Sequence, residues 1–584
     1  MKRRIQLIRV LTAAAVLSAG LSMTSYAEEG WAEENGGWAY YDAEGKRVTD
    51  RLLELDGNYY YIGEDGLMVS NQWVAIDNEN ADPDELMYED EPWIGSPYEE
   101  DFEMSGLPDE PRQYWYYFQD NGKAYKGSGS SSVTRTKEIN GKKYAFDDEG
   151  RMLYGWVLDG ERLTGEDAWM EGEYYFGEED DGAMKLGWQK LRIFTDPDNE
   201  VLPDDGIWED EMQDRWFYFS ETGKKKKGKE NRIGRLTLYG QKYGFDEYGR
   251  MISSWYADPT LITTEVYDKT LGADVNREER QGGEDYSREF MYFGSPESGA
   301  KYTKGWFRAR PSRYLMESKH EDGETYMYYA DGSGNLCVNE IRTIGGEKYA
   351  FDNYGRQIRG IVCLTMEDET TSSKIESTWY QDKTDREFSS FEAFNDLIDY
   401  ERYNSRGDLV ECYQQEFDSR KRRFYYFNGK DGAMLTGTHM VTLGDEKFEF
   451  AFEDDGRLKG SGLFGKKDGK LYQAGMLMKP EEGQKYAIVR VEDKEQKVGM
   501  NVEHFQTLDI MSVRDFIAEV CNSGIYDEER DETVWTVRYE PEHVEYYLVS
   551  QNGKIVKNKK RATDDDGYQF YVKNNKIKSI TVEE

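Results

Sequence analysis

The chain of 584 residues is poor in the residues that build metal and catalytic centres, with four histidines and four cysteines. The histidines are scattered, and none has the His-Glu-x-x-His or another spacing that holds zinc. The acidic runs at 178–181 and 564–566 lack the central glycine and final glutamate of a calcium loop. We therefore expect no metal and no other cofactor.

A nucleophile–base pair is missing as well. A nucleophilic Cys521 with His504 or His543 as its base would need a local catalytic signature, and none surrounds it. The segment 480–545 is also short for an independent catalytic domain. We predict that the protein is not an enzyme, and catalysis by 480–545 is the least favoured alternative.

Positive charge is in short supply. The chain has 75 Lys and Arg against 116 Asp and Glu, which gives a formal net charge of −41. Such a field disfavours binding to nucleic acid and to anionic membrane surfaces unless a local basic patch intervenes. A run of four lysines at 224–227 stands out against this background.

Long apolar runs are missing after the first 27 residues, where no stretch approaches the ~18 to 20 apolar residues of a membrane span. Residues 1–27 have a basic start, an apolar middle and a small-residue cleavage pattern that ends at Ala27. We expect a signal peptide and a secreted protein that stays at the cell surface or cell wall by binding to it.

Aromatic residues and glycines are abundant. Aromatics make up 14% of the chain, with 45 tyrosines, and 58 glycines accompany only 12 prolines. A disordered acidic chain would be poor in aromatics, so this chain should fold. The glycines predict many tight turns.

One aromatic phrase recurs at long intervals. Between residues 115 and 156, runs such as Trp-Tyr-Tyr-Phe and Lys-Tyr-Ala-Phe are each followed by a glycine turn, which is typical of β-hairpins. The position of Phe146 recurs at Phe245, Phe351 and Phe452, after 99, 106 and 101 residues. This period, with hairpins of roughly 20 residues nested in it, indicates a repeat array.

The predicted fold is all-β, with acidic inserts at 77–113 and 195–214 and short helices at 390–403 and 512–520. The expected divisions are a signal peptide at 1–27, a hairpin repeat array at 28–365, an excursion with a short helix at 366–420, further hairpins at 421–479, a non-repeat segment with a short helix at 480–545, and terminal hairpins or a cap at 546–584.

These phrases resemble the cell-wall-binding repeat family, which includes the choline-binding modules of Gram-positive surface proteins, the glucan-binding repeats and the repeats of large clostridial toxins. The shared pattern is Gly-Trp, a short gap, Trp-Tyr-Tyr, a glycine turn and Gly-Trp again. It covers most of 30–475 and weakly 540–580. The resemblance implies an elongated solenoid of stacked hairpins, with ligands held in aromatic sites between neighbouring hairpins.

The resemblance also implies which aromatics bind ligand. Trp31 and Trp38 stand in one undisturbed phrase, with Tyr60 of the next hairpin as a third wall. The full candidate set is Trp31, Trp38, Tyr60, Trp73, Trp115, Trp156, Trp188, Trp216 and Trp306.

The sequence allows two identities for the ligand, choline and a glycan. Lys143, Lys242 and Lys348 replace the second Trp of the phrase, so those hairpins cannot complete a choline cage. A glycan needs fewer aromatic walls. The expected partner is therefore a cell-wall polymer or glycan, either choline-substituted teichoic acid or polysaccharide, and the lysines at 224–227 are a candidate contact for teichoic acid phosphate.

A second hypothesis makes the protein structural or adhesive. Each aromatic then serves only to pack one hairpin on the next, because an isolated hairpin is marginally stable. The acidic inserts would then contact a protein partner.

The four cysteines, Cys337, Cys363, Cys412 and Cys521, allow three pairings in an exported chain. The preferred disulfide joins Cys337 to Cys363, which are expected on adjacent hairpins.

Overall fold

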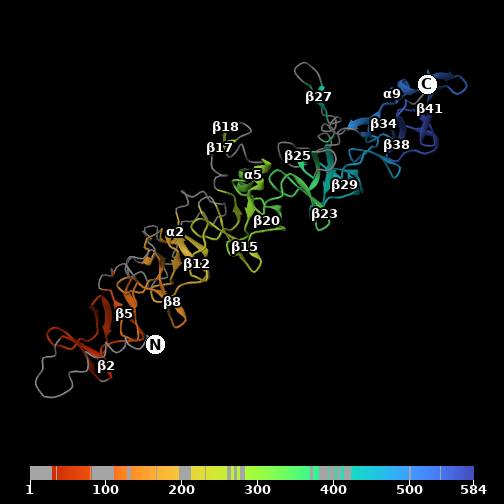
Figure 1. Cartoon of the computed structure of the whole chain (residues 1–584). Helices are drawn as coiled ribbons and strands as arrows, with labels where there is room; N and C mark the ends of the chain where they lie inside the picture. The colour runs from red at the N-terminus through yellow and green to blue at the C-terminus, as the bar shows by residue number, and fades with distance from the viewer. Residues whose placement is uncertain are drawn as a thin grey trace, which may run out of the picture. The chain divides into compact units, whose positions relative to one another are not determined.

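The computed structural model consists mostly of short antiparallel strands with few helices (Figure 1). The chain divides into two compact units, unit 1 (residues 1–200 and 206–252) and unit 2 (residues 201–205 and 253–584). Within the described residues, no helix is long and apolar enough to cross a membrane. The structure describes residues 29–34, 36–78, 81, 111–127, 133–165, 167–195, 212–229, 232–258, 265–268, 273–276, 283–367, 373–380, 394, 401–403, 409–412, 422–498, 501–538 and 541–583.

Unit 1 is a series of hairpins. Consecutive strands pair as β1–β2, β3–β4, β5–β6, β7–β8, β12–β13 and β14–β15, and β9 pairs with both β10 and β11. Its elements are β1 (Gly30–Glu34), β2 (Gly37–Tyr41), β3 (Arg51–Leu55), β4 (Asn58–Ile62), β5 (Gln72–Asp77), β6 (Gln113–Phe118), β7 (Thr136–Ile139), β8 (Lys142–Ala145), β9 (Trp156–Leu158), β10 (Glu161–Arg162), α2 (Ala168–Glu171), β11 (Tyr174–Tyr175), β12 (Gly187–Phe194), β13 (Met212–Phe219), β14 (Gly234–Leu238) and β15 (Gln241–Phe245).

The hairpin turns use residues with positive φ. Asp56 and Gly57 join β3 to β4 with φ of 49° and 67°, and Asn140 and Gly141 join β7 to β8 with φ of 51° and 79°. Two successive positive φ values make the turn whose twist matches that of the paired strands. The glycine turns expected from the sequence are confirmed here.

A backbone hydrogen bond joins one hairpin to the hairpin before it. After the second strand of a hairpin the chain makes a further glycine turn. The residue that follows this turn donates its backbone N–H to a carbonyl in the preceding hairpin. Met68 donates to the Trp38 carbonyl at 2.6 Å, and Met152 donates to the Trp115 carbonyl at 2.7 Å. The same bond recurs from Ala124 to Tyr59, Met184 to Lys143, Lys225 to Glu173, Met251 to Trp216, Gln357 to Met327 and Met434 to Lys348.

The residue that donates this hydrogen bond packs its side chain against a glycine in the turn that ends the following hairpin. A Cβ on Gly122, whose φ is 77°, would lie 2.2 Å from the Met68 sulfur. The glycine therefore satisfies two demands at once, positive φ and close approach of a methionine. Met152, Met184 and Met434 occupy equivalent slots at Gly182, Gly223 and Gly460, and Lys225 takes the methionine's place at Gly249.

Unit 2 continues the hairpins and adds wider sheets. β24 pairs with both β25 and β28, and one five-stranded sheet has the order β29-β30-β33-β32-β31. The elements up to residue 477 are β16 (Trp255–Tyr256), β17 (Glu265–Asp268), β18 (Ala273–Asn276), α5 (Glu284–Arg288), β19 (Met291–Tyr292), β20 (Gly305–Ala309), α6 (Glu317–Glu321), β21 (Tyr326–Ala330), β22 (Glu340–Ile344), β23 (Glu347–Phe351), β24 (Gly360–Met366), β25 (Ile375–Tyr380), β26 (Glu401–Tyr403), β27 (Leu409–Cys412), β28 (Arg422–Phe427), β29 (Gly437–Leu443), β30 (Glu446–Phe452), β31 (Gly465–Lys467), β32 (Lys470–Gln473) and β33 (Met476–Leu477).

The last hundred residues form two sheets and a helix. One sheet has the order β35-β34-β38 and the other β36-β37-β41-β40-β39. The strands are β34 (Tyr486–Val498), β35 (Asn501–Met511), β36 (Ile525–Asp527), β37 (Glu532–Thr536), β38 (Val544–Ser550), β39 (Lys559–Thr563), β40 (Gln569–Lys573) and β41 (Lys576–Glu583). Ser512 caps α9 (Val513–Val520) by accepting the Asp515 N–H at 3.1 Å, so the helix predicted at 512–520 is confirmed.

Two sequence predictions need correction. The helix predicted at 390–403 falls largely outside the described residues: Phe394 is helical, as predicted, whereas the last three positions form strand β26 and correct the prediction there. The predicted Cys337–Cys363 disulfide is also wrong. Cys337 is a free thiol whose sulfur accepts a hydrogen bond from Arg342 Nη1 at 3.1 Å, whereas Cys363 packs in a separate cluster with Phe424 and Val441.

Candidate aromatic binding sites

In the hairpins whose first strand carries tryptophan as its second residue, the strand register sets that tryptophan opposite another ring. In β12–β13, Trp188 stands across from Tyr218, and their ring centroids are 5.2 Å apart at 72°. The next hairpin supplies a third ring from β15, because Tyr243 lies 5.0 Å from Trp188 at 64°. We call such a set a seam: one tryptophan, its cross-strand ring and a ring of the following hairpin.

Four seams share these distances and keep their tryptophan half-buried, so part of each indole meets solvent. They are Trp31 with Tyr40 (5.1 Å) and Tyr60 (5.1 Å), Trp73 with Tyr117 (5.1 Å) and Tyr144 (4.8 Å), Trp188 with Tyr218 and Tyr243, and Trp306 with Tyr329 (5.0 Å) and Tyr349 (4.9 Å). We call these the open seams. The predicted set Trp31, Tyr60, Trp73, Trp188 and Trp306 therefore lies in them.

Two further seams have the same ring geometry but are buried, and we call them the closed seams. Trp156 is 8% exposed and contacts Tyr175 at 5.0 Å and Phe217 at 5.3 Å. Trp169 of α2 packs on Phe217, with ring centroids 6.3 Å apart, and donates its indole N–H to the Phe194 carbonyl at 2.8 Å. A short inserted helix thus contributes to the cluster that buries this predicted binding residue.

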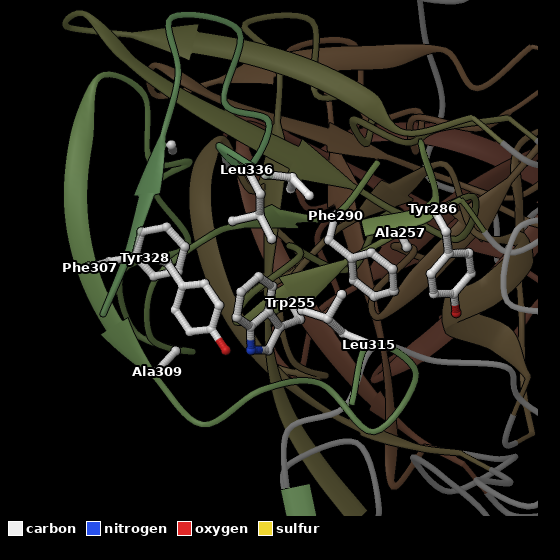
Figure 2. Packing of buried hydrophobic residues seen from close by; sticks show 11 residues of the cluster. Trp255, Ala257, Tyr286, Phe290, Phe307, Ala309, Leu315, Tyr328 and Leu336 are labelled. Carbon is white, nitrogen blue, oxygen red and sulfur yellow. The ribbon is translucent and has the colours of Figure 1, made fainter. Parts of the chain in front are cut away.

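Trp255 forms the second closed seam and is 1% exposed. It contacts Tyr292 at 5.2 Å and Tyr328 at 5.0 Å, and Figure 2 shows its indole between Tyr328 and Phe290. Sequence reasoning missed Trp255 because Ser254, with φ of 56°, stands where the phrase has glycine. Its spacing was a usable signal, since Trp255 follows Phe245 by the same ten residues that separate Trp156 from Phe146.

A lysine enters the Trp156 seam. The Lys225 ammonium lies 4.9 Å from the Trp156 ring centroid and 5.9 Å from that of Phe217. It donates to the Trp169 carbonyl at 2.5 Å and the Met170 carbonyl at 3.3 Å. Burial, with a smaller contribution from neighbouring Lys227, lowers the pKa of Lys225 to about 7. This seam therefore contains a lysine amine of the protein's own, which loses its charge as pH rises above about 7.

The second tryptophans of the phrase differ in exposure. Trp38 is 42% exposed, Trp115 packs with Trp73 against the Tyr144 and Phe146 cluster, and Trp216 stands at 89° to Trp188 with centroids 6.3 Å apart. Trp188 and Trp216 thus form a right-angled corner of two half-buried indoles. Both residues belong to the predicted set, but the sequence pattern paired Trp31 with Trp38 and not Trp188 with Trp216.

The ring distances limit what a seam can hold. Rings about 5 Å apart at steep angles are in edge-to-face contact, so no ammonium group fits between them. A ligand at an open seam must therefore lie on the solvent-facing side of the indole. Stacking of a sugar face needs only such a surface.

Sequence reasoning also missed an arginine–aspartate ion pair in the turns that follow β8, β15 and β23. Arg151, Arg250 and Arg356 each bond an aspartate four residues earlier, at Nε–Oδ2 distances of 2.6, 2.6 and 2.7 Å. Arg151 and Arg356 also lie over Tyr114 and Tyr326, at 4.8 and 4.9 Å. The repeated sequence motif Asp-x-x-x-Arg with Gly before the Arg could have predicted this ion pair. The pair contributes to packing between hairpins, because two of the arginines lie over a tyrosine of the preceding hairpin.

Comparison with known proteins finds one matching family model and distant relatives. Residues 29–73 match the family model of the choline-binding repeat. Glucosyltransferase-S of Streptococcus mutans is 21% identical over 329 residues, covering 54% of this chain and 18% of the relative, and glucosyltransferase-I of Streptococcus downei is 23% identical over 397 residues, covering 57% and 23%. This chain thus spans less than a quarter of either relative's length.

Among solved structures, choline binding protein F from Streptococcus pneumoniae is similar at 14% identity, over 77% of this chain and 99% of that chain, with a TM-score of 0.24. Residues 29–73 thus contain a repeat of the choline-binding type, which is one branch of the cell-wall-binding repeat family.

Proposed function

We propose that this protein is a secreted, non-catalytic surface protein that attaches to a cell-envelope polymer or glycan through its open seams. The observation that carries the proposal is the recurrence of one three-ring arrangement with a solvent-facing indole at Trp31, Trp73, Trp188 and Trp306. A repeated, partly exposed tryptophan gives many weak contacts on one chain, and many weak contacts add up on a repetitive polymer. The solenoid of stacked hairpins belongs to the same proposal.

A polysaccharide is the favoured ligand. The rings of each open seam touch one another, so the seam offers a flat face more than a cage. Trp38, at 42% exposure, adds a face beside the Trp31 seam in the residues that match the choline-binding repeat.

Choline is the second candidate, and the Trp188–Trp216 corner favours it. Two perpendicular indoles can contact a quaternary ammonium from two sides, each contact contributing roughly 0.5 to 2 kcal/mol. The net charge of −41 also suits a cationic group.

Sedimentation with purified Gram-positive cell walls tests the proposal. We expect the mature protein to bind and oligosaccharide to elute it, whereas elution by free choline alone would assign the binding to the corner. Wall binding that neither compound reverses, or no wall binding, would contradict the proposal and favour a structural or adhesive protein.

Trp38→Ala and Trp169→Ala form an informative pair. Trp38 is exposed, so its removal should weaken wall binding while the unfolding transition stays in place. Trp169 is 2% exposed in the closed Trp156 seam, so its removal should lower stability and leave the affinity of the folded fraction unchanged.

A further inference from the structure

One segment of unit 1 reverses the charge of the chain. Residues 224–242 contain eight lysines and arginines and one acidic residue, Glu230, within a chain of net charge −41. Two of the eight have structural roles: Lys225 is buried, and Lys224 pairs with Glu173 at 2.9 Å. The remaining cations are Lys226, Lys227, Lys229, Arg232, Arg235 and Lys242.

Five of these cations are exposed, namely Lys227, Lys229, Arg232, Arg235 and Lys242. In the part of the chain that the structure describes, none of the five forms an ion pair with a carboxylate. A cluster of like charges without partners is electrostatically unfavourable, and an anion bound there would relieve it.

The backbone brings the five cations into one surface. Lys229 and Arg232 exchange two backbone hydrogen bonds of 2.8 Å, which places these two residues side by side. The chain folds back on itself, since a Cβ on Gly234 would lie 2.5 Å from the Lys227 carbonyl oxygen. Lys227 therefore lies next to the start of β14, where Arg235 follows.

The hairpin β14–β15 extends the surface. Arg235 pairs with Gly244 and Thr237 pairs with Lys242, so Arg235 and Lys242 are diagonal neighbours on one face. The opposite face carries Tyr243, which packs on Trp188. The basic face points away from the packed rings, and its side chains are available to a partner.

The fold does not require these charges. The equivalent segment of unit 2 at 335–348 has two basic and two acidic residues, and the one at 433–449 has one lysine and three acidic residues. Both segments make the same kind of hairpin, β22–β23 and β29–β30. The equivalent segment of unit 1 at 123–143 is also basic, with six lysines and arginines and one acidic residue. The basic character is therefore shared by these two segments of unit 1 and is absent from the two segments of unit 2.

We propose that the basic surface formed by Lys227, Lys229, Arg232, Arg235 and Lys242 docks a flexible phosphodiester polymer of the cell envelope. The inference rests on the proposed attachment function and names the anionic chemistry of its polymer. Two arginines and three lysines suit spaced phosphates, because guanidinium groups bind phosphate oxygens bidentately and ammonium groups act as point charges. A stiff nucleic-acid duplex is disfavoured, because it would extend from this small patch over a strongly acidic surface.

Charge reversal tests the surface. Fluorescence anisotropy would follow labelled poly(glycerol phosphate) binding to the mature protein and to the variant Arg232→Glu, Arg235→Glu, Lys242→Glu. The matched control is Lys430→Glu, Lys447→Glu, Lys459→Glu, which alters the net charge equally at exposed sites of unit 2. We expect at least a tenfold loss of affinity and a shallower salt dependence for the first variant, and less than a twofold change for the control.

Equal losses in both variants, or none in the first, would overturn the proposal. Duplex DNA or heparin that binds as tightly as the phosphate polymer, through the same residues, would also overturn it. Thermal unfolding of each variant shows that the fold is kept. The test is separable from the aromatic function, because Trp38→Ala measured on walls reports on the exposed aromatic face beside the Trp31 seam, whatever the charge reversal does.

Discussion

The Trp156 and Trp188 seams have nearly the same ring geometry and opposite accessibility. Each tryptophan contacts a cross-strand tyrosine and an aromatic ring of the next hairpin at 5.0 to 5.3 Å. Trp156 is buried beside Lys225 and the Trp169 cluster, whereas Trp188 stays half-buried at a corner with Trp216. Ring geometry therefore does not distinguish a buried seam from an open one, whereas the residues packed around the seam, Trp169 of α2 and Lys225, do.

The largest expected effect lies in a closed seam. Trp255→Ala removes a fully buried indole and should lower the free energy of unfolding by about 3 to 5 kcal/mol. Trp188→Ala should cost about 1 to 2 kcal/mol, because its indole is only half-buried. Denaturant unfolding of the two variants measures the difference, and equal losses would remove the distinction between closed and open seams.

The methionine slots predict the next largest effect. Gly122→Ala should cost about 2 to 4 kcal/mol, because its Cβ would overlap the Met68 sulfur and its φ is positive. Gly57→Ala is the matched control, with positive φ and open space around its Cβ, and should cost about 1 kcal/mol. Similar losses of unfolding free energy in urea titrations of the two variants would show that the contact between Met68 and Gly122 does not contribute to stability.

The depressed pKa of Lys225 in the Trp156 seam predicts that stability depends on pH. The pKa of Lys225 is about 7 in the folded protein and near 10.5 when unfolded, so between these values only the unfolded state binds the proton. Stability should thus rise with pH in this window, by up to about 1.4 kcal/mol per unit, and fall back as pH drops towards 7.

Lys225→Met isolates this effect, because methionine occupies the equivalent slot in neighbouring hairpins. The difference in stability between wild type and variant should shrink as pH rises from 7 to 10. A difference that stays constant over that range would mean that Lys225 is not held in a dry site.

The hairpins and helix α9 were predictable from the sequence, because each depends on residues that are close together in the chain. Aromatic alternation and glycine turns gave the hairpins, and Ser512 with its apolar face gave α9. The accessibility of each seam was not predictable, since α2 adds Trp169 from outside the repeated phrase. Lys225 looked like one of four surface lysines, and only the register of its turn directs it inwards.

Wall binding by the double variant Trp38→Ala, Trp188→Ala tests the central claim most directly. The account predicts that the folded variant binds purified walls at least fivefold more weakly than wild type, a loss of about 1 kcal/mol or more, with its cooperative unfolding preserved. Wild-type affinity in a folded variant would contradict it, because the exposed Trp38 and the open seam of Trp188 would then contribute nothing to attachment.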